Sequence, residues 1–286
     1  MSLPCVHESR HSARDSNGFP DNNHLFHFQI NIMPSKRVNF QNQSGTQLAG
    51  ILDLPANPPR GFALFAHCFT CTKDLKAIVK ISRRLATHDI GILRFDFTGL
   101  GSSGGDFSQS NIQTNMSDIA AANQWLAQEH QPPKLLIGHS LGGAAMMAMA
   151  GKIESAKSIV TLASPSGTKH LAKFLDAQNP DIRKLGVGEV VIGGRSHTMR
   201  SQLLDSLGEF DLKPLIQQIS IPHLILHSPV DKTLAFKHAE EIFDWTSGAK
   251  SLITLEGSDH LLINQPGDVN YVGDLIATWS GKWIDA

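Results

Sequence analysis

The sequence lacks the marks of several large protein classes. It has only 3 cysteines among 286 residues, a sparse and odd count that argues against a disulfide scaffold and is typical of a reducing cytosol. Its 25 basic and 26 acidic residues leave a net charge of −1, which indicates neither nucleic acid nor an anionic membrane as a partner. No run in it approaches the roughly 20 apolar residues that span a bilayer. We therefore expect a cytoplasmic protein that binds a small molecule.

The N-terminal segment also lacks the apolar stretch of a signal peptide. It is rich in Ser, Asn, His and Asp, a composition that predicts a disordered tail over residues 1–35. Regular patterning starts near a second methionine, Met33, so residues 1–32 are either an over-long start, an added segment or a natural tail. We predict one domain over residues 36–286, because a hydrophobic content of 41% suffices for one sizeable core.

This domain alternates apolar runs with segments of helical spacing. Residues 37–55 predict two strands around a Gln-Ser-Gly turn. Later strands such as GFALFAH and KLLIGHS are apolar at every position, and helical patterns separate them. Such strands are typical of a parallel sheet covered on both faces. The predicted fold class is therefore α/β, with a mostly parallel, doubly wound sheet and an antiparallel N-terminal strand pair.

Residues 166–213 interrupt the alternation. Their pattern predicts a helix, a hairpin around Gly193 and Gly194, and a second helix. The segment stands between two core strands, so it must project from the sheet, and we interpret it as a small lid. Its short length predicts a modest cavity and hence a small or medium substrate.

The segment KLLIGHSLGGAAMM carries the strongest chemical signal. Residues 138–142 match the pattern G-x-S-x-G, with an apolar run before them and an Ala/Met-rich helix after them. In this pattern the serine occupies a tight strand-to-helix turn, and small flanking residues prevent backbone clashes. Ser140 is therefore predicted to be an exposed nucleophile at the carboxyl end of the sheet, at the positive end of the following helix.

Two further strands end in residues that can complete a catalytic triad. Asp231 follows the strand HLILH and His260 follows SLITLEG, so both reach the edge of the sheet where Ser140 is expected. In the predicted roles, His260 is the general base and Asp231 orients its imidazole. Asp259 is the weaker candidate for the acid, because its side chain is expected to point away from the partner of the ring.

The stretch FAHCFTCTKD follows a buried strand and admits two interpretations. A serine nucleophile needs two backbone N–H donors for the developing oxyanion, and we predict those of Leu141 and of Phe69, which lies in this loop. Cys68 and Cys71 also have the spacing of a redox dithiol or of half a zinc site. A thioredoxin-like fold would not explain the serine, aspartate and histidine in their order, and no second cysteine pair completes a zinc site. The simplest interpretation is that both cysteines are small residues packed in an oxyanion loop, with no bound metal.

A glycine pattern at residues 99–104 suggests a different site. It matches G-x-G-x-x-G and follows the strand ILRFDF, but a dinucleotide site requires a helix to open within the motif. The chain continues as GDFSQSN, which is typical of a loop. Nucleotide binding is therefore disfavoured, and no cofactor is expected.

Together these motifs resemble the α/β-hydrolase superfamily, from about Val38 to Trp283. The resemblance is carried by HCFT, RFDFTGLGSS, GHSLGG, Asp231 and the Asp-His pair at 259–260. More narrowly, AHCFTCTKD, LRFDFTGLGSSGGDF and LLIGHSLGGAA are similar to the hydrolase half of bacterial proteins that join such a domain to an OsmC-like thiol peroxidase domain. The resemblance implies a sheet of the α/β-hydrolase type with the lid as an insertion.

The resemblance also implies an activity. We expect a serine hydrolase that cleaves an ester, thioester or related acyl bond through an acyl-enzyme, while the fold does not select among acyl substrates. In one departure from the family pattern, Cys68 replaces the usual glycine after His67, and a side chain there can narrow the oxyanion hole. The alternative hypothesis is a thiol-redox or non-catalytic binding protein on the same fold that uses Cys68 and Cys71. The sequence does not predict the oligomeric state.

Overall fold

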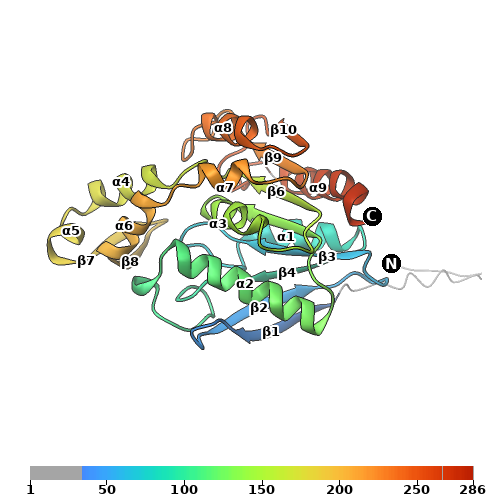
Figure 1. Ribbon diagram of the computed structural model, residues 1–286, viewed down its shortest axis with the longest axis horizontal. Coiled ribbons are helices and arrows are strands. Elements are labelled where there is room, and N and C mark those ends of the chain that lie inside the picture. Colours follow the sequence, from blue (N-terminus) through green and yellow to red (C-terminus); the bar gives the residue numbers. More distant parts are fainter. Residues whose placement is uncertain (1–33, 266, 286) are drawn as a thin grey trace, which may run out of the picture. The chain divides into compact units, whose positions relative to one another are not determined.

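The computed structural model describes residues 34–265 and 267–285, and in this part of the chain the strands form an eight-stranded sheet and a separate two-stranded hairpin (Figure 1). The predicted tail lies outside the described residues, apart from residues 34 and 35. Of these, Ser35 is already the first residue of a strand.

The strand order across the large sheet is β1-β2-β4-β3-β5-β6-β9-β10. Neighbours from β4 to β10 run parallel, whereas β2 is antiparallel to both β1 and β4. The prediction of a mostly parallel sheet with an antiparallel N-terminal pair is confirmed. The strands of this sheet are β1 (Ser35–Gln41), β2 (Gln47–Asp53), β3 (Gly61–Ala66), β4 (Ile90–Phe95), β5 (Leu135–His139), β6 (Ser158–Leu162), β9 (His223–His227) and β10 (Lys250–Thr254).

Helices cover both faces of this sheet, which explains why its strands are apolar at every position. Successive residues of a strand point to opposite faces, so in β3 Leu64 belongs to one buried cluster and Phe65 to the other. The Phe65 cluster includes α1 (Lys76–Ala86) and α9 (Asp268–Ile284). The Leu64 cluster includes α2 (Ile112–Glu129), α3 (Leu141–Ala150) and α8 (Lys237–Trp245).

The predicted lid region folds as a helical layer with a β-hairpin, and Figure 1 shows it to one side of the large sheet. The hairpin turns at Gly193 and Gly194, whose φ angles of 57° and 76° fall in the region that glycine tolerates best. The pattern missed one short helix, α5. The lid elements are α4 (Lys169–Gln178), α5 (Asp181–Leu185), β7 (Val187–Ile192), β8 (Arg195–Arg200) and α6 (Ser201–Glu209), after which α7 (Lys213–Gln217) leads back to β9.

The glycine-rich segment 99–104 has a structural role. A Cβ atom at Gly101 would lie 2.2 Å from Oδ2 of Asp96, so the loop can fold this closely onto the end of β4 only with glycine. The next regular element is the short 3-10 helix η1 (Phe107–Gln109), not a helix that opens within the motif. Among the helices that the structure describes, none has the length and apolar character needed to cross a membrane.

Candidate active site

Ser140 occupies the turn between β5 and α3, at the carboxyl end of the sheet. Its φ of 53° lies in the left-handed region, which is strained for a residue with a side chain. The flanking glycines make this turn possible. A Cβ atom at Gly138 would lie 2.4 Å from Cα of Gly143, and one at Gly142 would lie 2.2 Å from the carbonyl oxygen of His67. The second contact also places the turn directly against the loop that follows β3.

The structure brings together the three residues that the sequence assigned to a triad. Nε2 of His260 lies 3.0 Å from Oγ of Ser140, and Nδ1 of His260 lies 2.7 Å from Oδ2 of Asp231. Both distances are within hydrogen-bonding range. Asp259 does not contact the imidazole in this way; its Oδ1 instead accepts from the backbone N–H groups of Ile263 and Asn264.

Asp231 is held in its ionised form. Burial by itself would raise the pKa of this carboxyl group, but hydrogen bonds from His227, His260 and the backbone N–H of Leu234 outweigh burial and lower the pKa well below its usual range. The N–H of Thr233 also donates to Oδ1 at 2.7 Å. An ionised carboxylate fixed in this way keeps a proton on Nδ1 of His260 and leaves Nε2 free to accept one from Ser140.

His139 contacts the backbone of His260, the candidate base. Its side chain is only 3% exposed, and burial together with the nearby His260 lowers the pKa of His139 to about 3. The ring is therefore neutral, and its Nε2–H donates to the carbonyl oxygen of His260 at 2.8 Å. His139, which precedes Ser140, thus holds the backbone of the loop that carries His260.

The backbone N–H groups of Phe69 and Leu141 are candidate donors to a substrate oxygen. In the part of the chain that the structure describes, neither group has a protein hydrogen-bond acceptor. Leu141 is the first residue of α3, where N–H groups have no partner within the helix. The two residues line the same pocket. This arrangement can stabilise negative charge on a carbonyl oxygen that is attacked by Ser140.

His67 orients the Phe69 donor. Its Nε2 accepts from the N–H of Phe97 at 3.2 Å, so Nδ1 carries the proton and donates to the carbonyl oxygen of Cys68 at 2.8 Å. In a trans peptide the C=O and N–H point in opposite directions, so the Phe69 N–H points away from the ring. Burial lowers the pKa of His67, which keeps this neutral tautomer in place.

The two cysteines of this loop differ from the expectation of free, packed side chains. Cys68 and Cys71 form a disulfide, and the Cys71 N–H also donates to the Cys68 carbonyl oxygen at 3.2 Å. Cysteine spacing alone could not distinguish a bonded pair from a free pair. Among the described residues, no group of three or more His, Cys, Asp or Glu side chains is arranged to hold a metal ion.

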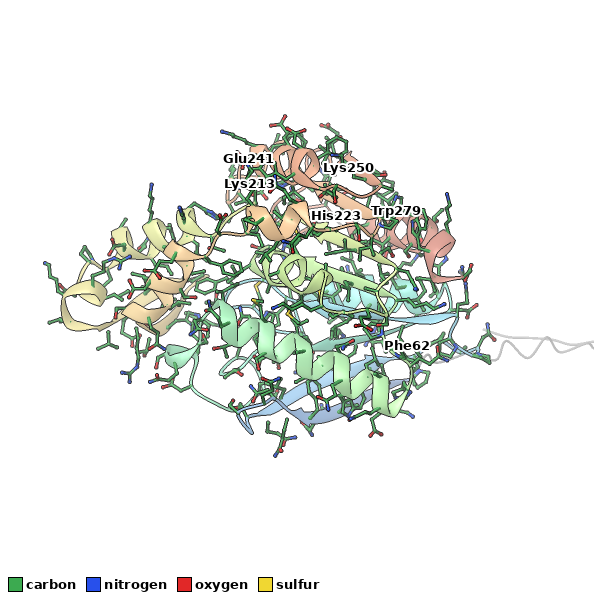
Figure 2. All side chains as sticks on the ribbon, in the orientation of Figure 1. Phe62, Lys213, His223, Glu241, Lys250 and Trp279 are labelled. Atoms are coloured by element: carbon green, nitrogen blue, oxygen red, sulfur yellow. A yellow bond between two sulfur atoms is a disulfide. The ribbon has the colours of Figure 1, made fainter. Side chains whose placement is uncertain are left out.

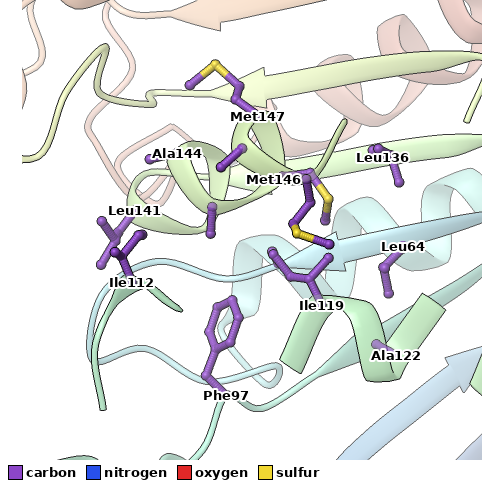
Figure 3. Close-up of a cluster of buried hydrophobic side chains, with 14 of the residues drawn as sticks. Leu64, Phe97, Ile112, Ile119, Ala122, Leu136, Leu141, Ala144, Met146 and Met147 are labelled. Atoms are coloured by element: carbon purple, nitrogen blue, oxygen red, sulfur yellow. The ribbon is translucent and has the colours of Figure 1, made fainter. Parts of the chain in front are cut away.

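A pocket opens beside the two donors. It comprises about 350 Å³ of space outside the protein atoms, part of it open to solvent. Phe69, Phe97 and Phe107 give it an aromatic wall, and Leu203 and Leu207 of α6 close it from the lid. Figure 3 shows Leu141, the first residue of α3, next to Ile112, the first residue of α2. Both residues line the pocket.

Sequence reasoning missed the supporting roles of three histidines. His139 occupies an unspecified position of the G-x-S-x-G pattern. His67 belongs to the loop motif, but the pattern assigns it no role. His227 ends β9, four residues before Asp231. Nε2 of His227 lies 3.4 Å from Oδ2 of Asp231 and 3.0 Å from the carbonyl oxygen of Leu234. One feature of the sequence could have identified these three histidines: each lies close to a candidate site residue or to the end of a strand.

Fold and site together define a class: a serine on a strand-to-helix turn, at the carboxyl edge of a mostly parallel eight-stranded sheet, is the arrangement of α/β hydrolases. A sequence model of the Alpha/beta hydrolase family matches residues 61–270. The chain therefore belongs to this family, and it is a hydrolase.

Known proteins similar to this chain include several esterases. An esterase domain from a Rhodothermus marinus protein is 35% identical, with a TM-score of 0.70 over 88% of this chain and 100% of that one. Est1E from Butyrivibrio proteoclasticus, solved with ferulic acid bound, is 19% identical with a TM-score of 0.75, over 86% of this chain and 99% of that one, which shows a shared fold. The lysophosphatidylserine lipase ABHD12 of Danio rerio is 25% identical over 66% of this chain and 48% of its own length.

Proposed function

We propose that this enzyme is a serine hydrolase that cleaves ester or thioester bonds of small to medium acyl groups through an acyl-enzyme on Ser140. One observation carries the proposal. A continuous hydrogen-bonded chain runs from Oγ of Ser140 through His260 to Asp231, beside two N–H groups that have no acceptor among the described residues.

The geometry suggests how the reaction would proceed. Nε2 of His260 takes the proton of Ser140 while Oγ attacks the carbonyl carbon, and the carboxylate of Asp231 stabilises the imidazolium that forms. The carbonyl oxygen gains negative charge next to the N–H groups of Phe69 and Leu141. His260 then donates the proton to the departing alcohol or thiol, which leaves an ester on Ser140. Water, activated by His260, hydrolyses this ester by the same route in reverse.

The pocket supports the limit on acyl size. It adjoins both proposed oxyanion donors, so an acyl chain attached to the reacting carbonyl can extend into it. Its walls are mostly aromatic and aliphatic, and α6 of the lid closes it at Leu203 and Leu207. The walls leave little free space between them, which favours short and medium acyl groups over long lipid chains.

A fluorophosphonate probe and an ester panel test the proposal. The probe should label the wild-type protein at Ser140 and leave Ser140→Ala unlabelled. The same substitution should reduce kcat on p-nitrophenyl acetate by roughly 10⁴-fold or more, since triad members act as a unit. Near-normal turnover by Ser140→Ala would contradict the assignment. A chain-length series of p-nitrophenyl esters and matched thioesters then identifies the preferred bond and acyl group.

A further inference from the structure

The disulfide encloses one of the two proposed oxyanion donors. Phe69 and Thr70 are the residues between Cys68 and Cys71, so the Phe69 N–H belongs to a closed four-residue ring. A change in this ring therefore acts directly on the geometry of the oxyanion hole.

The ring also holds an unfavourable backbone conformation. Thr70 has a φ of 57°, in the left-handed region that a β-branched residue rarely adopts. The hydrogen bonds around the ring, from His67 Nδ1 and from the Cys71 N–H, both end on the Cys68 carbonyl oxygen. They hold the Cys68–Phe69 peptide, which carries the Phe69 N–H, while the Thr70 hydroxyl donates to the Phe69 carbonyl oxygen at 2.7 Å. Without the disulfide, Thr70 can relax and Cys71 can move away with its N–H, so that only His67 still holds this peptide and the Phe69 N–H can tilt out of position.

One of the two sulfur-bearing residues is accessible. Cys68 is 4% exposed and lines the pocket, whereas Cys71 is partly exposed. The remainder of the loop is anchored independently, because the Lys73 N–H donates to Oδ1 of Asp96 at 2.7 Å and its ammonium group pairs with Oδ2 at 2.8 Å. Opening the disulfide would therefore release a short segment between two fixed points, without unfolding the loop.

We propose that Cys68 and Cys71 form a reversible thiol–disulfide exchange site whose substrate is a small or protein dithiol, and that the disulfide form is the active hydrolase. The inference rests on the proposed function, since it assigns Phe69 to the oxyanion hole. A thiolate of the reductant attacks Sγ of Cys71, the S–S bond breaks, and Cys68 leaves as a thiolate that takes up a proton. The second thiol of the reductant then displaces Cys71 and forms the disulfide of the oxidised reductant. Two electrons and two protons pass to the enzyme in total.

The test uses the full chain with Cys5→Ser, which removes the third cysteine from the thiol count. The protein is incubated with dithiothreitol, separated from it, and assayed with p-nitrophenyl acetate, with Ser140→Ala as the blank. Native alkylation followed by mass spectrometry should show two new thiols. We expect kcat to fall about 10-fold with little change in KM, because a donor is displaced rather than removed, and full loss of a donor costs about 10²- to 10³-fold. Reoxidation with diamide should restore kcat.

The double variant Cys68→Ser/Cys71→Ser is the matched control. It should have the kcat of the reduced enzyme and should not respond to dithiothreitol. Unchanged kcat in a protein with both thiols alkylated would overturn the proposal, as would a disulfide that native dithiothreitol cannot open, or a double variant that still responds. If the untreated protein hydrolyses no ester and takes no fluorophosphonate, the proposed function has failed. The exchange site is then supported by two new thiols on reduction and overturned by none.

Discussion

Nε2 of His139 donates a hydrogen bond to the carbonyl oxygen of His260 at 2.8 Å, so the residue before the candidate nucleophile supports the candidate base. A glutamine at position 139 can place an N–H near the same point, whereas phenylalanine cannot. We expect His139→Phe to lower kcat on short esters about 10- to 100-fold, because small displacements of a reacting group are costly. His139→Gln should lose much less. Equal losses in both variants, at equal melting temperature, would show that the hydrogen bond is unimportant.

A second pair of substitutions tests the orientation of the Phe69 donor. Asparagine resembles the Nδ1 side of histidine and glutamine resembles the Nε2 side. His67→Asn should therefore keep the donor to the Cys68 carbonyl oxygen, and His67→Gln should lose it. We expect kcat to fall at least 10-fold further in His67→Gln than in His67→Asn, with similar KM, since the contact matters for the oxyanion. Steady-state kinetics with p-nitrophenyl acetate decide between them; the reverse order would refute the assigned tautomer.

Two leucines of helix α6 provide a test variant and a matched control variant for the role of the lid in acyl-chain preference. Leu203 and Leu207 line the pocket, whereas Leu204 of the same helix is fully buried and does not line it. Leu207→Ala should enlarge the pocket and raise the rate on p-nitrophenyl octanoate relative to acetate. Leu204→Ala should leave this ratio unchanged. Each substitution is expected to destabilise the fold by about 2–5 kcal/mol, so thermal unfolding must be measured alongside. Equal ratios in the two variants would mean that the lid is only structural.

Acid stability should depend on His223, the first residue of β9, which is labelled in Figure 2. The side chain is 0% exposed, and burial lowers its pKa to about 3. The unfolded chain binds a proton below the ordinary histidine pKa of about 6.5, while the folded chain does not, so stability falls as pH drops from about 6.5 toward 3. The contribution of one such group is roughly 1 kcal/mol per pH unit.

The variant His223→Gln removes this titration. Its free energy of unfolding, measured with urea between pH 6.5 and 4.5, should fall less steeply than that of the wild type, even if the variant is less stable at neutral pH. The two hydrogen bonds of the ring, to Oγ1 of Thr161 at 2.9 Å and of Thr246 at 3.1 Å, explain the expected loss at neutral pH. Identical slopes would show that His223 is not kept neutral by the fold.

Much of the sheet and of the candidate site follows from local patterns. Apolar runs and a turn pattern identified most strands of the large sheet, and three residues at strand ends, Ser140, Asp231 and His260, were singled out because parallel strands share one carboxyl edge. The order of strands and the antiparallel pairing of β2 with β4 did not follow, because pairing depends on contacts between distant segments. The pattern also gave no sign that Cys68 is bonded to Cys71.

The contacts of the buried histidines also could not be predicted from the sequence. A histidine in a strand such as His139 or His227 looks the same in sequence whether it fills the core or supports a neighbour. What distinguishes His139 is a carbonyl group on a loop 121 residues away in the chain. Such a contact arises only after the sheet has assembled, so no local periodicity reports it.

The three candidate triad residues lie far apart in the sequence, and this affects when the site forms during folding. Ser140 directly follows β5, in the middle of the sheet, but Asp231 and His260 follow β9 and β10, which come after the lid segment in the chain. Contacts of such long sequence separation form late in folding. If Ser140 is the nucleophile, its reactivity toward a fluorophosphonate should therefore report when β9 and β10 have docked. During synthesis we expect Ser140 to stay unreactive until β9 and β10 have emerged and docked.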